Sequence, residues 1–398
     1  MMLTALRDLV YPLLQGARNS LYTATYWLGA RLRPMRENAV ILATVRARDI
    51  SDNLAYIEAA LDRKTYDVTT YSFARRQTTI LGRLGPSLRF IWAMAQTKYT
   101  IVDDFLPLVY PAHLRPGARL VQVWHALGAF KRVGYSRAGR NGGPPMTSIS
   151  HKNYTDVIVS ADSIRSNYAE AFGVSLQVVR ATGVPRTDLF FDTEARRLIV
   201  DDLRERIPRL RDRRIILFAP TFRGIDKRHA KYPADFVDLE RLGDSLNDTD
   251  LLVIKMHPFV TAATRIPGRH RDKMIDLSSY PEFNHLLLLA DVLVTDYSSA
   301  VFDYALLDRP VVFHAPDLAN YILERGFYYD FRQYCYGPVT TDTDELIAAL
   351  STTTVDHERL AEFCQRFLNR CDGHATERFM RQIFGVEKAS DGTHPDPT

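Results

Sequence analysis

Short runs of β-branched and other apolar residues alternate with helical patterns along most of the chain. Several of these runs are continuous, which is typical of parallel strands that are covered on both faces. Eleven strands are predicted, at Val40–Val45, Asp67–Phe73, Tyr99–Val102, Leu120–Trp124, Asp156–Ser160, Val178–Ala181, Ile215–Ala219, Leu251–Met256, Met274–Leu277, Val292–Thr295 and Val311–His314. Helices are predicted around them, at Asn53–Leu61, Leu88–Gln96, Ser163–Phe172, Phe236–Leu246, Phe283–Ala290, Ala300–Asp308, Arg359–Asn369 and Ala375–Phe384. This alternation favours an α/β fold with doubly wound sheets.

So many strands fit two sheets better than one open sheet. The charged stretch Thr193–Arg214, in which acidic residues interrupt the arginines, predicts a solvated helix and a hinge between the sheets. The predicted architecture is therefore two Rossmann-like domains that face each other across a cleft, followed by C-terminal helices. The expected divisions are an N-terminal helical segment at 1–36, a first domain at 37–195, a second domain with the terminal helices at 196–386, and a disordered tail at 387–398.

The first 36 residues predict an amphipathic helix. Their apolar positions at helical spacing are Leu3, Leu6, Val10, Leu13, Leu14, Leu21, Tyr22 and Trp27. Five arginines against the single acidic residue Asp8 would suit an anionic membrane surface. A helix packed on its own domain is the alternative, and the pattern alone leaves both open. No run reaches the roughly 20 apolar residues of a transmembrane helix, and no clean signal peptide is present.

Composition narrows the class of protein further. Hydrophobic residues make up 46% and charged residues 25%, as in soluble globular proteins. The net charge of +4 is too small for a dedicated nucleic-acid binder, so no nucleic acid is expected as a partner. Three cysteines fit neither a disulfide framework nor a Cys-rich metal site, and they favour a reducing cytoplasm.

Polar side chains follow several predicted strands, where open α/β sheets bind their ligands. His125 is placed to act as a general base, although a strand-end histidine bonded to the backbone is the alternative. Thr221 and Arg223 offer a hydroxyl and a forked cation that suit a phosphate. Lys255 and His257 end another strand with further donors.

The segment Thr295–Ser299 runs from a buried strand into a helix. Ser298 and Ser299 can cap that helix, whose free N–H groups form an anion site; ordinary capping is the alternative. The aromatic residues of Arg325–Asp330 are interpreted as core or as the wall of the cleft. Asp103-Asp104 is interpreted as a strand-end loop, because adjacent strand carboxylates point to opposite faces. No metal site and no glycine-rich nucleotide motif is predicted.

In combination, these segments resemble the CDP-glycerol glycerophosphotransferase family, the teichoic acid primases and polymerases. The resemblance spans about residues 98 to 385. It rests on ordered motifs: Trp124-His125, Gly183 to Asp188, Ala219 to Arg223, Lys255 to Pro258, Tyr280-Pro281, Leu286 to Leu289, Thr295 to Ser299, Phe302-Asp303, Arg309-Pro310, Asp317-Leu318 and Arg325 to Tyr328. One departure is Ala126, where the family usually has glycine, and it bears on the acceptor side of the cleft.

The resemblance implies a GT-B-like fold with the donor nucleotide on the second domain. It also implies that a hydroxyl of a membrane-linked acceptor attacks the phosphorus that carries glycerol in CDP-glycerol and releases CMP. His125 would accept the hydroxyl proton, and His257 is the second catalytic candidate. The implied substrate-binding residues are Thr221, Arg223, Lys255, Asp296, Ser298, Ser299 and Asp303, the last toward a ribose hydroxyl. No metal or other cofactor is expected.

The expected partners are CDP-glycerol or CDP-ribitol, a lipid-linked or polymer acceptor, and the cytoplasmic face of the cell membrane, where the protein would be peripheral. The choice between the two donors stays open, as does the choice between a single addition and polymerisation. Two other functions are weighed: a GT-B glycosyltransferase that uses a nucleotide sugar, and a non-catalytic membrane-associated scaffold. The intact His125 and the intact Thr295–Ser299 segment speak against the scaffold.

Overall fold

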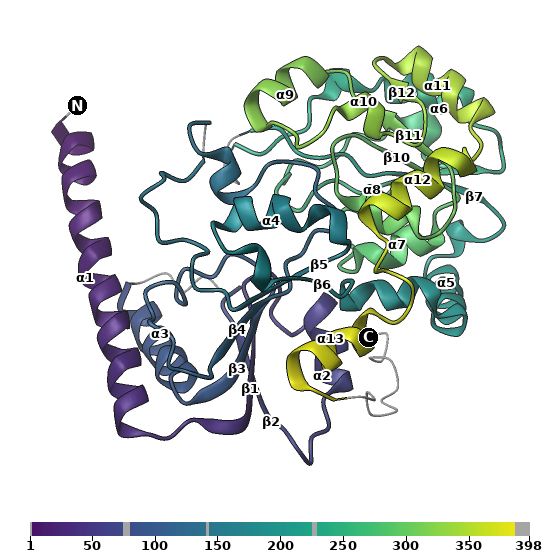
Figure 1. The fold of residues 1–398 in the computed structure, drawn as a ribbon. Helices are drawn as coiled ribbons and strands as arrows, with labels where there is room; N and C mark the ends of the chain where they lie inside the picture. Colours follow the sequence, from purple (N-terminus) through teal and green to yellow (C-terminus); the bar gives the residue numbers. More distant parts are fainter. Residues whose placement is uncertain (1, 75–79, 141–142, 225–228, 387–398) are drawn as a thin grey trace.

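The strands of the protein form two six-stranded parallel sheets (Figure 1). The computed structural model describes residues 2–74, 80–140, 143–224 and 229–386, and for residues 2–12, 80 and 81 it describes the backbone only. All eleven predicted strands are present within one or two residues of their expected ends, except that β1 begins earlier, and a short strand, β12, is added. The tail predicted at 387–398 lies outside the described residues.

Both sheets have the crossover order of doubly wound folds. The order of the first is β2-β1-β3-β4-β5-β6 and that of the second is β12-β11-β10-β7-β8-β9. The first sheet comprises β1 (Arg36–Thr44), β2 (Asp67–Ser72), β3 (Thr97–Val102), β4 (Arg119–Gln122), β5 (Asp156–Val159) and β6 (Val179–Ala181). The second comprises β7 (Arg214–Phe218), β8 (Asp250–Ile254), β9 (Met274–Asp276), β10 (Val292–Thr295), β11 (Val311–His314) and β12 (Val339–Thr340). Their central strands are buried on both faces, which explains the continuous apolar runs.

Helices cover the sheets and end the chain. They are α1 (Met2–Leu32), α2 (Asp52–Ala60), α3 (Ile80–Met94), α4 (Arg165–Phe172), α5 (Thr193–Arg206), α6 (Leu239–Ser245), α7 (Phe283–Leu289), α8 (Ala300–Ala305), α9 (Leu318–Arg325), α10 (Phe331–Tyr334), α11 (Thr343–Thr352), α12 (His357–Phe367) and α13 (Ala375–Phe384). The predicted helix of the charged stretch is α5, and the Asp192 carboxylate caps its N-terminus. Asp residues cap α6, α11 and α12 in the same way.

The last helix returns to the first sheet (Figure 1). Both oxygens of Asp188 accept hydrogen bonds from backbone N–H groups at the start of α13, at 2.9 Å from Ala375 and 2.8 Å from Thr376. Phe379 and Ile383 of α13 are buried in a hydrophobic cluster with residues of the first sheet. The first half of the molecule is the part built on the first sheet, and the second half is the part built on the second sheet. The chain therefore crosses between the halves twice, and the domain division at residue 195 stays a proposal.

Close backbone and ring contacts join the two halves. Phe130, which follows β4, stacks on Phe327 with ring centroids 4.7 Å apart. The backbone N–H of Tyr328 donates to the carbonyl of Phe130 at 3.0 Å. The aromatic residues after α9 therefore form core and inter-half contacts, in agreement with the interpretation from sequence.

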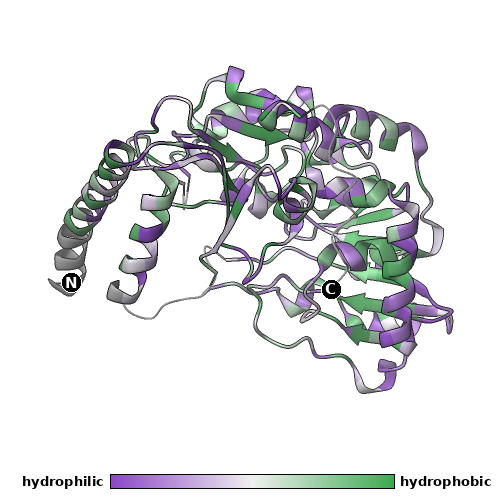
Figure 2. Ribbon diagram, turned by 90° about the horizontal axis from the view of Figure 1, so that it is seen from below, coloured by the Kyte–Doolittle hydropathy of each residue, from purple (hydrophilic) through white to green (hydrophobic). Residues whose placement is uncertain are grey.

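Helix α1 packs on the first half by one face only. Tyr22 and Tyr26 are buried, and the Thr23 hydroxyl donates to the carbonyl of Pro111 at 2.8 Å. Figure 2 shows α1 beside α3 at one end of the molecule. Among the described side chains of α1, from residue 13 onward, the large apolar ones left exposed are Leu13, Leu14, Leu21, Trp27, Leu28 and Leu32. Among the described residues, no helix is both long and apolar enough to cross a membrane.

Gly128 sets how closely the halves approach each other. Its φ is +61°, and a Cβ atom there would lie 2.0 Å from the ring of Phe302 on α8. We expect Gly128→Ala to lower the free energy of unfolding by about 1–3 kcal/mol more than Gly139→Ala, because the overpacked ring must move. Gly139 has a similar φ of +77° but nothing within 4 Å of a Cβ atom, so its substitution isolates the cost of the backbone conformation. Urea unfolding of both variants measures the difference, and equal losses would contradict this account.

Candidate active site

His125 lies in a sharp turn that begins where β4 ends. The turn needs a left-handed residue, and Trp124 supplies it with a φ of +47°. The Trp124 N–H donates to Gln122 Oε1 and the Trp124 carbonyl accepts from Asn53 Nδ2, both at 2.8 Å. Ala126 does not require a positive φ, so its side chain is accommodated in the same turn. The chain thereby holds His125 half-buried beyond the carboxyl edge of the first sheet.

Asp104 is the partner of His125 in this half. Its Oδ2 atom lies 3.2 Å from His125 Nδ1 and 3.6 Å from Arg46 Nη1. Because β3 and β4 are parallel neighbours, the residues that follow them meet at the same edge. Asp104 was interpreted from the sequence as part of a strand-end loop, and its contact with His125 was not predicted. The signal for it was the pairing of the two strands.

Burial and charge set the protonation of this pair. Burial lowers the pKa of His125 below its usual value, and the contact with Asp104 opposes that shift. Burial raises the pKa of Asp104, but contacts with His125 and Arg46 outweigh it and lower the pKa to about 2. At neutral pH the carboxylate is therefore charged and the imidazole neutral. Since Nδ1 faces Asp104, Nε2 is the ring atom left to accept a proton.

His257 occupies the matching position in the second half, after β8. Its ring lies 4.7 Å from the ring of Phe222, and its Nδ1 atom accepts a hydrogen bond from the Phe259 N–H at 3.1 Å. Burial lowers the pKa of His257 to about 4, with smaller contributions from Lys131, Arg46 and His125. Arg46 and His125 belong to the first half, so part of the electrostatic environment of His257 comes from across the junction of the halves.

A buried carboxylate organises the loops after β7 and β10. Asp296 is fully buried, and its Oδ1 atom accepts from the Thr221 N–H at 2.8 Å and also from the Thr221 hydroxyl. Its Oδ2 atom lies 2.9 Å from Arg223 Nη1, and Arg223 also pairs with Asp317 at 2.6 Å. Two carboxylates thus offset the charge of Arg223. In this structure Arg223 supports the loop ends, and its direct contact with a diphosphate stays a prediction.

The remaining residues predicted to bind the donor fall into three settings. Lys255 Nζ donates to the carbonyls of Ser278 and Tyr280, at 2.8 and 2.6 Å, and so ties the segment after β9 to the end of β8. Ser298, which precedes the N-cap residue of α8, accepts with its Oγ atom from the Ala300 N–H at 3.2 Å. Ser299 is half-buried, and its side chain makes no capping bond.

Asp303 is placed between the halves. Its two carboxylate oxygens accept from Arg186 Nη2 at 2.9 and 3.0 Å, and both residues are 5% exposed. Arg186 belongs to the Gly183–Asp188 motif of the first half. A role of Asp303 toward a ribose hydroxyl stays a prediction, since in this structure the carboxylate is engaged by Arg186.

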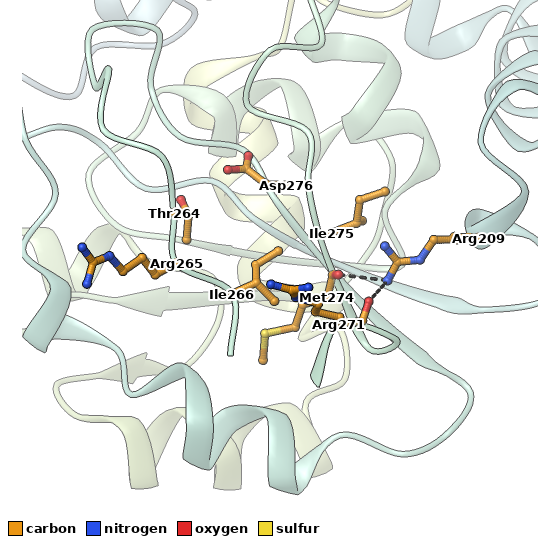
Figure 3. Close-up of a pocket in the computed structure, with 8 residues that line it drawn as sticks. All are labelled: Arg209, Thr264, Arg265, Ile266, Arg271, Met274, Ile275 and Asp276. Atoms are coloured by element: carbon orange, nitrogen blue, oxygen red, sulfur yellow. Dashed lines mark hydrogen bonds between the residues drawn. The ribbon is translucent and has the colours of Figure 1, made fainter. Parts of the chain in front are cut away.

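A separate pocket lies at the edge strand β9. Its volume is about 580 Å³. It is lined by Arg209, Thr264, Arg265, Ile266, Arg271, Met274, Ile275 and Asp276 (Figure 3). Arg209 donates to the carbonyl of Met274 at 2.9 Å, which ties the hinge after α5 to β9. None of the lining residues belongs to the predicted site.

The two parallel sheets define a GT-B-like fold, which comparison with solved structures supports. The chain aligns with a variant of the wall teichoic acid polymerase TagF at a TM-score of 0.74 and 21% identity, over 96% of each chain. Residues 26–385 match the family described as CDP-Glycerol:Poly(glycerophosphate) glycerophosphotransferase. The protein belongs to that family, as the motifs predicted.

Several relatives have names that assign them to teichoic acid synthesis. The chain is 40% identical over 353 residues to the teichoic acid poly(ribitol-phosphate) polymerase of Bacillus spizizenii, covering 89% of this chain and 57% of the relative. It is 35% identical to the teichoic acid ribitol-phosphate polymerase TarK of Staphylococcus aureus, covering 92% and 72%. It is 27% identical to the teichoic acid poly(glycerol phosphate) polymerase of Bacillus subtilis, covering 93% and 52%. The chain thus spans little more than half the length of some of these relatives.

Proposed function

We propose that this protein transfers a polyol phosphate from a CDP-activated polyol to a hydroxyl of a teichoic acid acceptor and releases CMP. Family membership supports the reaction class. The relatives named for ribitol phosphate are 40% and 35% identical and the one named for poly(glycerol phosphate) 27%, which favours ribitol phosphate as the unit. The observation that carries the proposal is the placement of His125 after β4 and His257 after β8, at the carboxyl ends of strands from the two sheets, with Asp104 Oδ2 3.2 Å from His125 Nδ1.

His125 is proposed as the general base. The acceptor hydroxyl gives its proton to Nε2 while its oxygen forms a bond to the phosphorus that carries the polyol. The bond from that phosphorus to the oxygen of CMP breaks at the same centre. The charged Asp104, 3.2 Å from Nδ1, stabilises the imidazolium that forms and fixes the orientation of the ring.

His257 is proposed as a neutral hydrogen-bond donor to the diphosphate. Its Nδ1 atom already accepts the Phe259 N–H, so the neutral ring carries its proton on Nε2. A pKa of about 4 keeps the ring in that state at neutral pH. Preorganised donors of this kind stabilise the charge that develops on a transferring phosphoryl group.

We also propose that the protein works on the cytoplasmic face of the membrane, held by the exposed face of α1. At 3.6 residues per turn, Leu14, Leu21 and Leu28 lie on one side of the helix, and Tyr22 and Tyr26 lie on the other, packed against the protein. The two interpretations of the segment are therefore compatible: one face packs on the domain, and the other is free to enter the lipid interface.

The donor is tested by measuring CMP release with CDP-ribitol and with CDP-glycerol, each with a teichoic acid acceptor. We expect turnover with both and a higher kcat/KM with CDP-ribitol. A higher kcat/KM with CDP-glycerol would overturn the ribitol assignment but keep the reaction class. Turnover of a UDP-sugar instead, with no CMP release, would contradict the proposed function.

Substitutions at His125 and Asp104 test the general base. His125→Ala should lower kcat by about 10²–10⁴-fold while the affinity for the CDP-polyol changes little. The base works in its neutral form, so activity is lost as the pH falls through the pKa of His125. Asp104 raises that pKa, so Asp104→Asn should move the acid limb of the kcat/KM profile to lower pH, besides slowing turnover. Asp162→Asn, which breaks an exposed ion pair with Arg370, is the control and should not move the acid limb of the profile. An acid limb that does not move in Asp104→Asn would refute the pairing of Asp104 with His125.

A charge on the exposed face of α1 tests the membrane contact. Leu28, 43% exposed, and Leu198 on α5, 47% exposed, form a matched pair. We expect Leu28→Glu to reduce binding to phosphatidylglycerol vesicles by roughly tenfold, since it removes apolar contact and adds repulsion, and Leu198→Glu to leave binding unchanged. Co-sedimentation at low and high salt measures both effects, and high salt should weaken the wild type. Equal pelleting of the two variants would remove α1 as the anchor.

A further inference from the structure

A cluster of basic side chains lies at the junction of the halves, on the side of His257. Its members are Lys131, Arg137 and Arg140, which come from the loop after β4, and Arg325, which ends α9. The backbone joins these segments, because Lys131 forms a β-bridge with Phe327 and the Arg132 N–H donates to the carbonyl of Gly326 at 3.1 Å. The cluster thus contains residues of both halves.

The cluster is continuous with the candidate active site. The guanidinium of Arg325 lies 5.6 Å from the centroid of the Phe222 ring, and the His257 ring lies 4.7 Å from the same ring. Lys131 contributes to the electrostatic environment of His257 and is itself coupled to Asp296. Lys131 is therefore the inner member of the cluster.

Arg140 lies over Gly326 on the other side of Arg325. A Cβ atom at Gly326 would be 2.9 Å from the Arg140 Cζ atom, so the absence of a side chain there admits the guanidinium. Arg140 Nη1 donates to the carbonyl of Leu323 at 3.4 Å, and Arg325 Nη2 donates to that of Gly224 at 2.7 Å. Both guanidinium groups thus contact neutral carbonyl oxygens.

Three members of this cluster differ in their partners from other cations of the described surface. Within the described ranges, no carboxylate pairs with Lys131, Arg140 or Arg325, whereas arginines elsewhere on the surface, such as Arg36 and Arg197, pair with acids at 2.6 and 2.7 Å. The described charged groups that act on Lys131 are three arginines, Arg325, Arg223 and Arg137, and one acid, Asp296. The Asp296 carboxylate is already paired with Arg223. Cations gathered in this way lower their mutual repulsion by binding an anion.

We infer that Lys131, Arg137, Arg140 and Arg325 bind a phosphate group of the acceptor chain, next to the hydroxyl that is extended. The ligand class is a polyol-phosphate oligomer, and this assignment rests on the proposed function. Three of the four side chains come from the half that holds His125, which serves the acceptor hydroxyl. The candidate donor groups Thr221, Ser298 and His257 follow strands of the other half. The cluster is therefore assigned to the acceptor and not to the CDP-polyol.

Arg140→Gln is the decisive variant, because Arg140 contacts none of the predicted donor residues in the described structure. Arg211→Gln is the matched control: Arg211 is exposed, has no acidic partner among the described residues, and donates to the carbonyl of Arg204 at 2.9 Å. We expect Arg140→Gln to raise the KM for a ribitol-phosphate oligomer about tenfold and to leave the KM for the CDP-polyol unchanged. Arg211→Gln should change neither value.

Direct binding separates this inference from the proposed function. The probe is a short ribitol-phosphate oligomer, titrated into the full chain by calorimetry without donor, with inorganic phosphate as a second arm. Binding of the oligomer that weakens about tenfold in Arg140→Gln supports the site, even if no CDP-polyol is turned over. Unchanged oligomer binding and an unchanged acceptor KM, in a protein that releases CMP, would overturn the site and leave the proposed function intact. Weaker binding to anionic vesicles alone would make the cluster a membrane contact and also overturn the inference.

Discussion

The relative placement of the two halves depends on the buried ion pair between Arg186 and Asp303. Removing two opposite charges from water is unfavourable, and the cost is offset only where each charge finds its partner with good geometry. Here the guanidinium meets both carboxylate oxygens at 2.9 and 3.0 Å. Any arrangement of the halves that separated the two side chains would leave a buried charge unpaired. The pair therefore selects one approach of α8 to the first sheet.

This constraint reaches both sides of the candidate active site. Asn53 Oδ1 accepts from the Arg186 N–H at 3.1 Å, while Asn53 Nδ2 donates to the carbonyl of Trp124 at 2.8 Å. One side chain thus connects the ion pair to the turn that carries His125. Asp303 lies one turn into α8, whose first residue is preceded by Ser298 and Ser299. The ion pair consequently links the turn that carries the proposed base, His125, to the loop proposed to hold the donor.

Positive charge in this region has two different uses. Arg223 is buried between Asp296 and Asp317, and its charge serves to organise the loops after β7 and β10. Lys131, Arg140 and Arg325 have no such acids in the described part of the chain, so their charge is available to an anionic ligand. The proposed transfer of a polyol phosphate involves an anion on both substrates, and the division between compensated and uncompensated cations would match that need.

The sequence by itself determined the strands, most of the helices and the edge of each sheet at which the candidate residues lie. Continuous apolar runs indicated parallel strands, and polar residues such as His125 and His257 at their ends marked the ligand-binding edge; all of this is local information. The contact of Asp104 with His125, the burial of Arg223 between two carboxylates, and the cluster around Arg140 were decided only by the tertiary structure. Each of them depends on which strands become neighbours and on how the halves approach each other. Those choices are made by side-chain packing between residues far apart in the chain, which no local pattern records.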